Sequence, residues 1–209
     1  MILSCLGSIL FGQANKFYVN PSFTQINFDV SSTDDIAGSN FKDLYSLSNS
    51  KTLGFSIGYY LNDRIALDMI LGVPPSTDII GQKEIEGLPI GSIKYAPMIL
   101  TINYKAFNIN RLGVIVGAGI NYTYILDEKD GAIEDLQVDN FLDPVLKAGL
   151  DFRLSNKISL AINMLKIING STTVSGKVGP NVPELAGAPT ISEIILNPIA
   201  AQIGVKYIF

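Results

Sequence analysis

Six charged residues fall at alternate positions of segments that are otherwise apolar or small. They are Asp68, Lys105, Lys147, Asp151, Arg153 and Lys206. Burying an isolated charge is costly, so charged side chains in such surroundings are normally paired or hydrated. The spacing therefore predicts a charge network in the interior of the protein.

The residue types needed for enzyme chemistry are scarce. The chain has no His, the commonest general base and metal ligand, and Cys5 is its single cysteine. A Ser–His–Asp or Cys–His arrangement is therefore impossible, and we expect no catalytic residues, no metal and no cofactor. The net charge of −4 also argues against nucleic acid as a partner.

Composition indicates which structural elements could hold these charges. Of the 209 residues 47% are hydrophobic and 16% are charged, and the mean hydropathy is +0.32. Soluble domains usually carry about 25% charged residues. No run reaches the roughly 18 apolar residues of a membrane helix. A chain this apolar without such a run favours membrane-spanning β-strands.

Alternation of apolar and polar residues is clearest at the C-terminus. One face of the last strand carries Phe209, Tyr207, Val205 and Ile203, and the other carries Lys206, Gly204 and Gln202. Segments 51–61, 64–73, 97–107, 113–124, 145–154 and 157–169 alternate likewise, and 17–30 does so less cleanly. An even number of strands near ten residues long is typical of a closed barrel in lipid.

The connections between these segments alternate in length. Residues 61–64, 108–111 and 154–157 are tight polar turns, whereas 31–49, 75–92, 125–143 and 172–191 are long. We therefore predict an all-β fold, an eight-stranded antiparallel transmembrane β-barrel with short periplasmic turns and four long extracellular loops. It would lie in a bacterial outer membrane with both termini periplasmic. A lipocalin-like barrel or a β-sandwich is the soluble alternative, but its exterior would be more polar.

The first residues are typical of a targeting segment. Residues 2–11 form an apolar core, and Gly12 to Ala14 supply small residues around a cleavage point. We predict a signal peptide over 1–14, incomplete at its start because the usual basic residues are missing, and a single barrel domain over 15–209. A buried N-terminal strand or helix is the alternative.

Several short motifs resemble the outer-membrane protein W (OmpW) family in their order and spacing. The motifs lie at 52–55, 59–63, 65–68, 72–74, 116–123, 148–152 and 197–209. The chain departs from the family at Ser76-Thr77-Asp78, where a His usually follows the Pro motif, and in having no Trp. Roles that the family assigns to those residues do not carry over.

The resemblance implies passive passage of small hydrophobic molecules, with an apolar upper lumen and a sideways exit into the bilayer. The residues expected to line that lumen are Ile70, Ile99, Leu165, Ile167 and Leu196. Pro74, Pro75 and Pro97 lack a backbone N–H, so the third and fourth strands should pair poorly where they meet the surface. That position is the predicted lateral gap.

A closed structural barrel is the alternative function. An eight-stranded barrel is just wide enough to be filled by its own side chains, and the inward charges could form a self-satisfied plug. Acidic loops would then act as a receptor surface, or bind divalent cations against lipopolysaccharide. Expected partners are outer-membrane lipid and lipopolysaccharide, small hydrophobic solutes, and the barrel-insertion machinery, which by resemblance recognises the Phe209 pattern.

Overall fold

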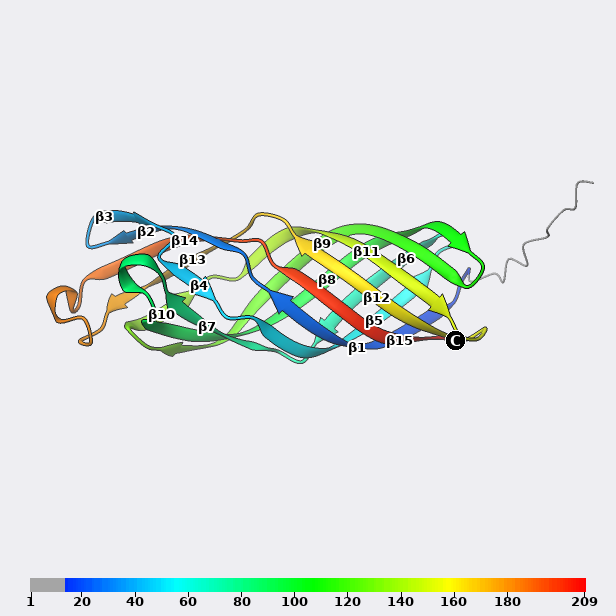
Figure 1. Cartoon of the computed structure of the whole chain (residues 1–209), viewed down its shortest axis with the longest axis horizontal. Helices are drawn as coiled ribbons and strands as arrows, with labels where there is room; N and C mark the ends of the chain where they lie inside the picture. The colour runs from blue at the N-terminus through cyan, green and yellow to red at the C-terminus, as the bar shows by residue number, and fades with distance from the viewer. Residues whose placement is uncertain (1–13) are drawn as a thin grey trace, which may run out of the picture.

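The computed structural model describes residues 14–209, which form an elongated all-β molecule (Figure 1). The predicted signal peptide falls almost entirely outside the described residues. Within 14–209 no helix has the length and apolar character needed to cross a membrane.

Eight strands close into a barrel. Each is hydrogen-bonded to its neighbours in the order β1-β5-β6-β8-β9-β11-β12-β15, and β1 returns to β15. All pairings are antiparallel, including the closing one, where Tyr18 faces Ile208. The strands are β1 (Phe17–Asn27), β5 (Ser50–Tyr60), β6 (Ile65–Gly72), β8 (Pro89–Ile109), β9 (Leu112–Asp130), β11 (Phe141–Arg153), β12 (Ile158–Ile167) and β15 (Ile199–Ile208). The eight-stranded barrel predicted from the sequence is confirmed.

Three tight connections lie at one end of the barrel, which we call the short-turn end. They join β5 to β6, β8 to β9 and β11 to β12. Asn15 and Phe209 lie at the same end, because Asn15 N–H donates to the Tyr60 carbonyl and Phe209 N–H donates to the Phe17 carbonyl.

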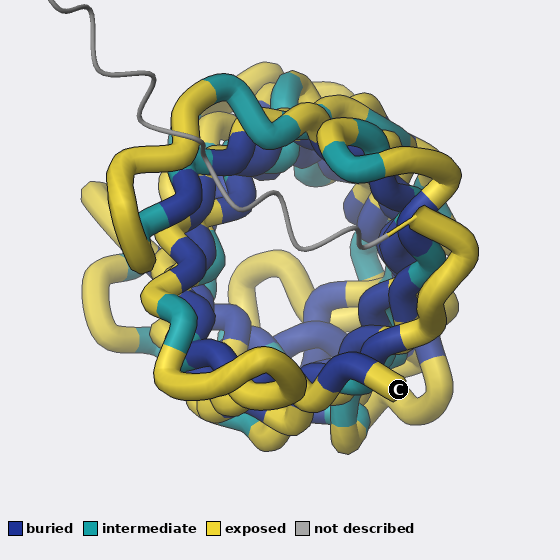
Figure 2. Tube along the Cα trace, turned by 90° about the vertical axis from the view of Figure 1, so that its right-hand side faces the viewer, coloured by how far each residue is buried: buried dark blue, intermediate teal, exposed yellow. Residues whose placement is uncertain are grey.

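Side chains alternate between the two faces of the barrel wall. Viewed along the barrel, buried residues line the inside of the ring and exposed residues lie outside (Figure 2). The outer face is apolar: β8 presents Leu100 and Ile102, and β15 presents Ile203 and Val205, all largely exposed. Such a face is stable in hydrocarbon, where closure also leaves no strand edge unpaired.

The four long connections are themselves mostly strand. A second sheet has the order β10-β13-β14-β2-β3, while β7 extends the β8 side of the barrel and β4 pairs with β7. These elements are β2 (Val30–Ile36), β3 (Ser39–Lys42), β4 (Tyr45–Leu47), β7 (Ser76–Gly81), β10 (Ile133–Val138), β13 (Gly170–Val178), β14 (Pro189–Leu196) and the short 3-10 helices Lys83–Ile85 and Pro183–Leu185. Together with the parts of β8 and β9 that lie farthest from the short-turn end, they form a continuation of the barrel, here called the extension (Figure 1). Positions toward the extension are called upper, and positions toward the short-turn end are called lower.

The polarity of the wall inverts between the barrel and the extension. In the extension the apolar residues point inward and build the largest core of the molecule, with Ile79, Ile93, Ile125, Leu136 and Val174 among its members. In the barrel the inward residues include Thr101, Asn103 and Asn163. The barrel wall is apolar on the outside, as lipid requires, and the extension wall is apolar on the inside, as water requires.

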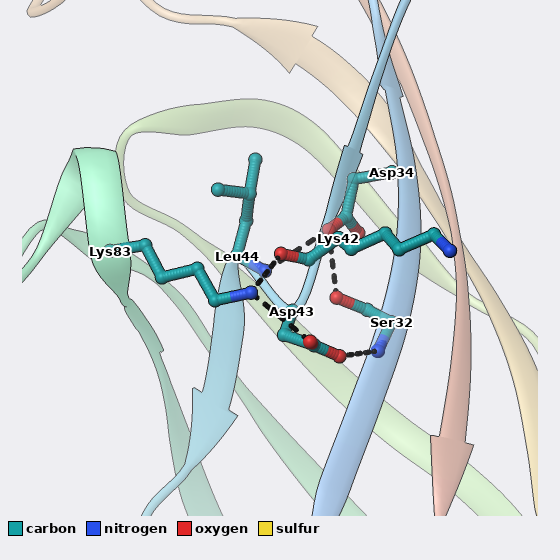
Figure 3. A network of polar contacts seen from close by, with 6 residues as sticks. All are labelled: Ser32, Asp34, Lys42, Asp43, Leu44 and Lys83. Atoms are coloured by element: carbon teal, nitrogen blue, oxygen red, sulfur yellow. Dashed lines mark hydrogen bonds and ion pairs between the residues drawn. The ribbon is translucent and has the colours of Figure 1, made fainter.

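Two seams in the extension lack a continuous backbone ladder and are held largely by side chains, although a backbone bond from Asp43 N–H to the Ser32 carbonyl, at 3.0 Å, also crosses the first. Between β2 and β4, the Asp34 carboxylate accepts hydrogen bonds from Ser32 Oγ at 2.7 Å and Leu44 N–H at 3.1 Å (Figure 3). Asp43 accepts from Ser32 N–H at 3.3 Å and from Lys83 Nζ at 3.1 Å.

The second seam lies between β9 and β10. There Asp130 accepts from Asp135 N–H and Leu136 N–H, and Glu128 accepts from Val138 N–H. Carboxylates thus satisfy backbone donors at both breaks in the sheet.

Candidate functional site

The lumen contains an apolar cavity of about 710 Å³, here called the barrel cavity. Its wall comes from β1, β5, β6, β8, β9, β11, β12, β14 and β15, together with Phe28 and Pro198 between strands. All five residues expected to line the channel are part of that wall, namely Ile70, Ile99, Leu165, Ile167 and Leu196. Ile70, Ile99 and Leu165 pack with Val145 in one buried cluster.

A second apolar cavity of about 410 Å³, the extension cavity, continues from the first. The two share five lining residues, Phe28, Tyr95, Thr123, Phe141 and Leu196. The remaining wall of the extension cavity is contributed by Leu47, Ile79, Ile93, Ile125, Val138, Thr172, Val174 and Ile194. The two apolar cavities are therefore adjacent, one inside the extension and one inside the barrel, and they share part of their walls.

The ladder between β6 and β8 is interrupted at the level of the barrel cavity. Their last paired residues are Ile70 and Ile99, and pairing resumes only where β7 meets β8 at Ser76 and Lys94. A single hydrogen bond, from Tyr95 N–H to the Pro75 carbonyl at 3.1 Å, closes the opening at its upper edge. We call the unpaired stretch, residues 71–75 opposite 96–98, the side window.

The side window forms part of the wall of the barrel cavity. Leu71, Gly72 and Pro97 line the barrel cavity and are each partly exposed. Pro74, Pro75 and Pro97 have no N–H to donate across the opening. The poor pairing expected from these prolines is thus present at the expected place.

Below the barrel cavity the lumen becomes polar. Buried side chains of this polar layer include Asn20, Ser22 and Gln202, the last of which also lines the barrel cavity, and an oxygen of each lacks a protein hydrogen-bond partner. Buried polar atoms in that situation normally bind water. A solute held by apolar contacts alone would lose them on entering this layer.

Beyond the polar layer lies a third cavity of about 290 Å³, which we call the short-turn chamber. Asp68, Lys105, Lys147 and Lys206 line it together with Tyr18, Tyr60, Arg64, Ala66, Asn103 and Ile115. Lys147 Nζ lies 2.6 Å from Asp68 Oδ2, and Lys206 Nζ is bonded to Asp151 Oδ2; these four residues are buried.

Aromatic rings hold two of the ammonium groups in place. Lys105 Nζ lies 5.6 Å from the centroid of the Tyr60 ring, and Lys206 Nζ lies 4.7 Å from that of Tyr18. Both are cation–π distances. Arg153, the last residue of β11, is half-buried and lies outside the chamber wall.

Sequence reasoning missed the aromatic and apolar residues that join the two apolar cavities. Phe28, Tyr95 and Phe141 lie near the ends of barrel strands, and Val138 and Val174 lie in segments expected to be loops. In 189–196 buried and exposed positions alternate, but both sets mix polar and apolar residues, so the sequence of this segment carried no clear signal.

Known proteins resemble this chain in sequence and in fold. A family model described as the OmpW family matches residues 13–209. The dibenzothiophene metabolism operon protein PahQ of Pseudomonas aeruginosa is 28% identical over 207 residues, which cover 97% of this chain and 93% of that protein.

Two further comparisons concern named outer-membrane proteins. Outer membrane protein AlkL of Ectopseudomonas oleovorans is 30% identical over 165 residues, covering 78% of this chain and 68% of that one. The crystal structure of OprG from Pseudomonas aeruginosa has the same fold, with a TM-score of 0.85 at 19% identity, covering 97% of this chain and 99% of that one.

Proposed function

The chain belongs to the OmpW family of bacterial outer-membrane β-barrels, and on that premise we propose that it is a narrow passive channel for small hydrophobic molecules with lateral release into the bilayer. One observation supports the proposal: the wall of an apolar cavity inside the barrel includes Leu71, Gly72 and Pro97, which lie where the β6–β8 ladder is interrupted. A hydrophobic solute would enter through the extension cavity, descend to Ile70 and Ile99, and leave between β6 and β8.

The lower lumen favours the sideways route over passage straight through. A solute moving past Ile70 would meet the polar layer and then the buried Lys147–Asp68 pair. Moving apolar groups into such surroundings is unfavourable, and it costs about 25 cal/mol for each Å² of apolar surface returned to a polar environment. Hydrocarbon lies next to the side window, so release there avoids that cost.

The description of one relative names a compound that supports the choice of solute. PahQ is described as a protein of a dibenzothiophene metabolism operon, and dibenzothiophene is a small fused aromatic compound with almost no polar surface. We propose small molecules of that character as substrates for this chain.

The orientation in the membrane belongs to the same proposal. With the short-turn end in the periplasm, both ends of the described chain would be periplasmic and the extension would stand in the lipopolysaccharide layer. Phe209, Tyr207, Val205 and Ile203 lie on the exposed outer face at that end, where the barrel-insertion machinery could bind them. Lipid and lipopolysaccharide are then the expected neighbours of the apolar outer face.

The test is uptake by liposomes that contain the refolded barrel. We expect a small apolar dye to enter and an equally small sugar to stay out. Ile70→Asp should reduce dye entry at least about tenfold, because a carboxylate in the apolar cavity costs several kcal/mol and about 1.4 kcal/mol is a factor of ten. Ile191→Asp, on the exposed outer face of β14, is the matched control and should not change uptake.

Folding of each variant is checked by far-UV circular dichroism. If Ile70→Asp does not fold, Leu165→Phe narrows the same cavity without adding charge and should slow the dye. Exclusion of both solutes by a folded barrel would contradict the proposal and favour a closed barrel whose extension binds surface partners. Equal entry of dye and sugar would contradict the apolar selectivity.

A further inference from the structure

The lower end of the barrel cavity is polar, although most of its wall is apolar. Thr24, Gly54 and Gln202 are the lowest residues that β1, β5 and β15 contribute to that wall. Ser22 lies one inward position below Thr24 on β1. We call these four residues the polar floor, and the channel proposal gives them no role beyond stopping an apolar solute.

The Gln202 amide is held by its nitrogen and leaves its oxygen free. Nε2 donates to Thr24 Oγ1 at 3.2 Å, and Gln202 and Thr24 are only 5% and 4% exposed. Oε1 has no hydrogen-bond partner among the described residues. A buried carbonyl oxygen without a donor is unfavourable, so a donor that reaches the floor of the cavity would bind there.

Gly54 provides the space that the hydroxyl groups of the polar floor occupy. A Cβ at this position would lie 2.7 Å from Ser22 Oγ and 2.9 Å from Thr24 Oγ1, which is too close for either contact. Ser22 Oγ, like Gln202 Oε1, lacks a hydrogen-bond partner among the described residues. The floor therefore combines a free amide acceptor with two hydroxyl groups in one place.

The charge of the cavity wall restricts which polar group could bind. None of the described residues that line the barrel cavity is charged. A carboxylate or an ammonium group would be buried there without a counter-charge, at a high cost. A hydroxyl group is neutral and supplies the donor that Gln202 Oε1 lacks, together with an acceptor for a hydroxyl of the floor.

We propose that the polar floor binds the hydroxyl group of an otherwise apolar solute, such as a phenol. The hydroxyl donates to Gln202 Oε1, and the apolar remainder packs on Leu165, Ile70 and Ile99. Leu165 is suitably placed, because it pairs with Ala200, the next inward position above Gln202. This inference rests on the channel proposal and narrows its substrate class to small apolar molecules with one hydroxyl.

The test compares phenol with toluene, which have similar sizes and differ in one hydroxyl. The refolded barrel in lipid nanodiscs carries isotope-labelled isoleucine methyl groups, and the NMR shifts of Ile70 and Ile99 report occupation of the cavity. We expect Gln202→Leu to raise the dissociation constant of phenol about fivefold relative to that of toluene, because one hydrogen bond is lost. Comparing this ratio between variants cancels the different partitioning of the two solutes into lipid.

Three further variants locate the effect. Gln25→Leu makes the same change on the outer face of β1 and should leave the ratio unchanged. If Gln202→Leu does not fold, Thr24→Val, which removes the hydroxyl that orients the amide, should reduce the preference for phenol. Tyr95 Oη, at the upper end of the cavity, also lacks a partner among the described residues, and Tyr95→Phe should have no effect on the ratio.

An unchanged ratio in the floor variants, a change in Tyr95→Phe instead, or no shift of Ile70 and Ile99 with either solute would overturn the hydroxyl site. Dye uptake by the same barrels separates this inference from the channel proposal. A barrel that takes up the dye but shows an unchanged ratio contradicts only the hydroxyl site. A barrel that binds phenol as expected and excludes the dye contradicts only the channel.

Discussion

Asp68 and Lys147 form the ion pair on which the polar lower lumen is centred. They lie 79 positions apart, on strands that are not neighbours in the sheet, so the pair spans the lumen between β6 and β11. Alternation in the sequence could predict that each side chain points inward. It could not predict the partner, because which residues meet across the lumen depends on how the barrel closes.

Breaking this pair should destabilise the barrel strongly. We expect Lys147→Met to lower the free energy of unfolding by about 3–5 kcal/mol, because the Asp68 carboxylate would remain buried without its counter-charge. Urea unfolding in lipid vesicles measures this quantity.

The double variant Asp68→Leu/Lys147→Met provides the control. It removes both charges and should be close to wild type in stability, since replacing a buried pair by apolar residues is often neutral. If Lys147→Met is as stable as the double variant, the buried Asp68 carboxylate does not depend on Lys147 as its counter-charge.

At the level of elements, the side window is the feature with the clearest physical cause. Three prolines and the end of β6 remove the donors that would continue the β6–β8 ladder beyond Ile70 and Ile99. The prolines are visible in the sequence, and they indicated this gap. The closing contact between Tyr95 and Pro75 was not predictable, because it depends on β7 resuming the pairing with β8.

A reversible cross-link tests whether solutes leave through the window. Leu71→Cys and Met98→Cys place thiols at the next facing positions, in a Cys5→Ser background. We expect oxidation to reduce dye uptake several-fold and a reductant to restore it, because the cross-link holds the edges of the window together. Unchanged uptake by the fully cross-linked barrel would show that the solute leaves by another route.

The seam between β2 and β4 predicts a dependence on pH. The hydrogen bond from Lys83 and the one from Ser32 N–H lower the pKa of Asp43 below its ordinary value of 3.8. A lowered pKa means that Asp43 stabilises the seam at neutral pH, fully so above the ordinary pKa, and that this contribution disappears as the pH falls through the lowered value.

Hydrogen exchange of the Ser32 amide measures this effect. Its protection factor should fall as Asp43 is protonated, and in Asp43→Ala it should be low already at pH 7. The change will be small, because the Asp43–Lys83 pair is exposed to solvent. The Leu44 amide, which donates to Asp34, is the internal reference, and an equal loss at both amides would point to opening of the whole seam.

The extension shows the limit of pattern reading at this level. Segments 31–49, 75–92, 125–143 and 172–191 were expected to be loops because they are rich in Gly, Ser, Asp and Pro. They fold into strands because each one pairs with a neighbour distant in sequence, as β14 does with β2. Strand propensity is weak in isolation and depends on such partners.

For the whole molecule, the inversion of polarity along the wall explains both the success and the gaps of the sequence reading. In the barrel the apolar residues face outward, and the even spacing of strands and turns was enough to predict the architecture. In the extension the apolar residues face inward, so a rule that assigns every apolar face to lipid overlooks its core. The two adjacent apolar cavities lie on either side of this boundary. Their shared wall could not be predicted from the sequence, because it combines residues of the barrel with residues of the extension.

The continuous β8–β9 hairpin has a mechanical consequence. These strands have 21 and 19 residues and stay paired from Gly91–Asp130 to Ile109–Leu112, with two register shifts. The hairpin therefore continues past the window as one rigid element. The opposite edge of the window is a short segment of chain anchored mainly through β5, where Val73 N–H donates to the Leu53 carbonyl. Thermal fluctuations that widen the opening would therefore displace residues 71–75 while Pro97 stays fixed, and a label on Val73 would show the larger amplitude.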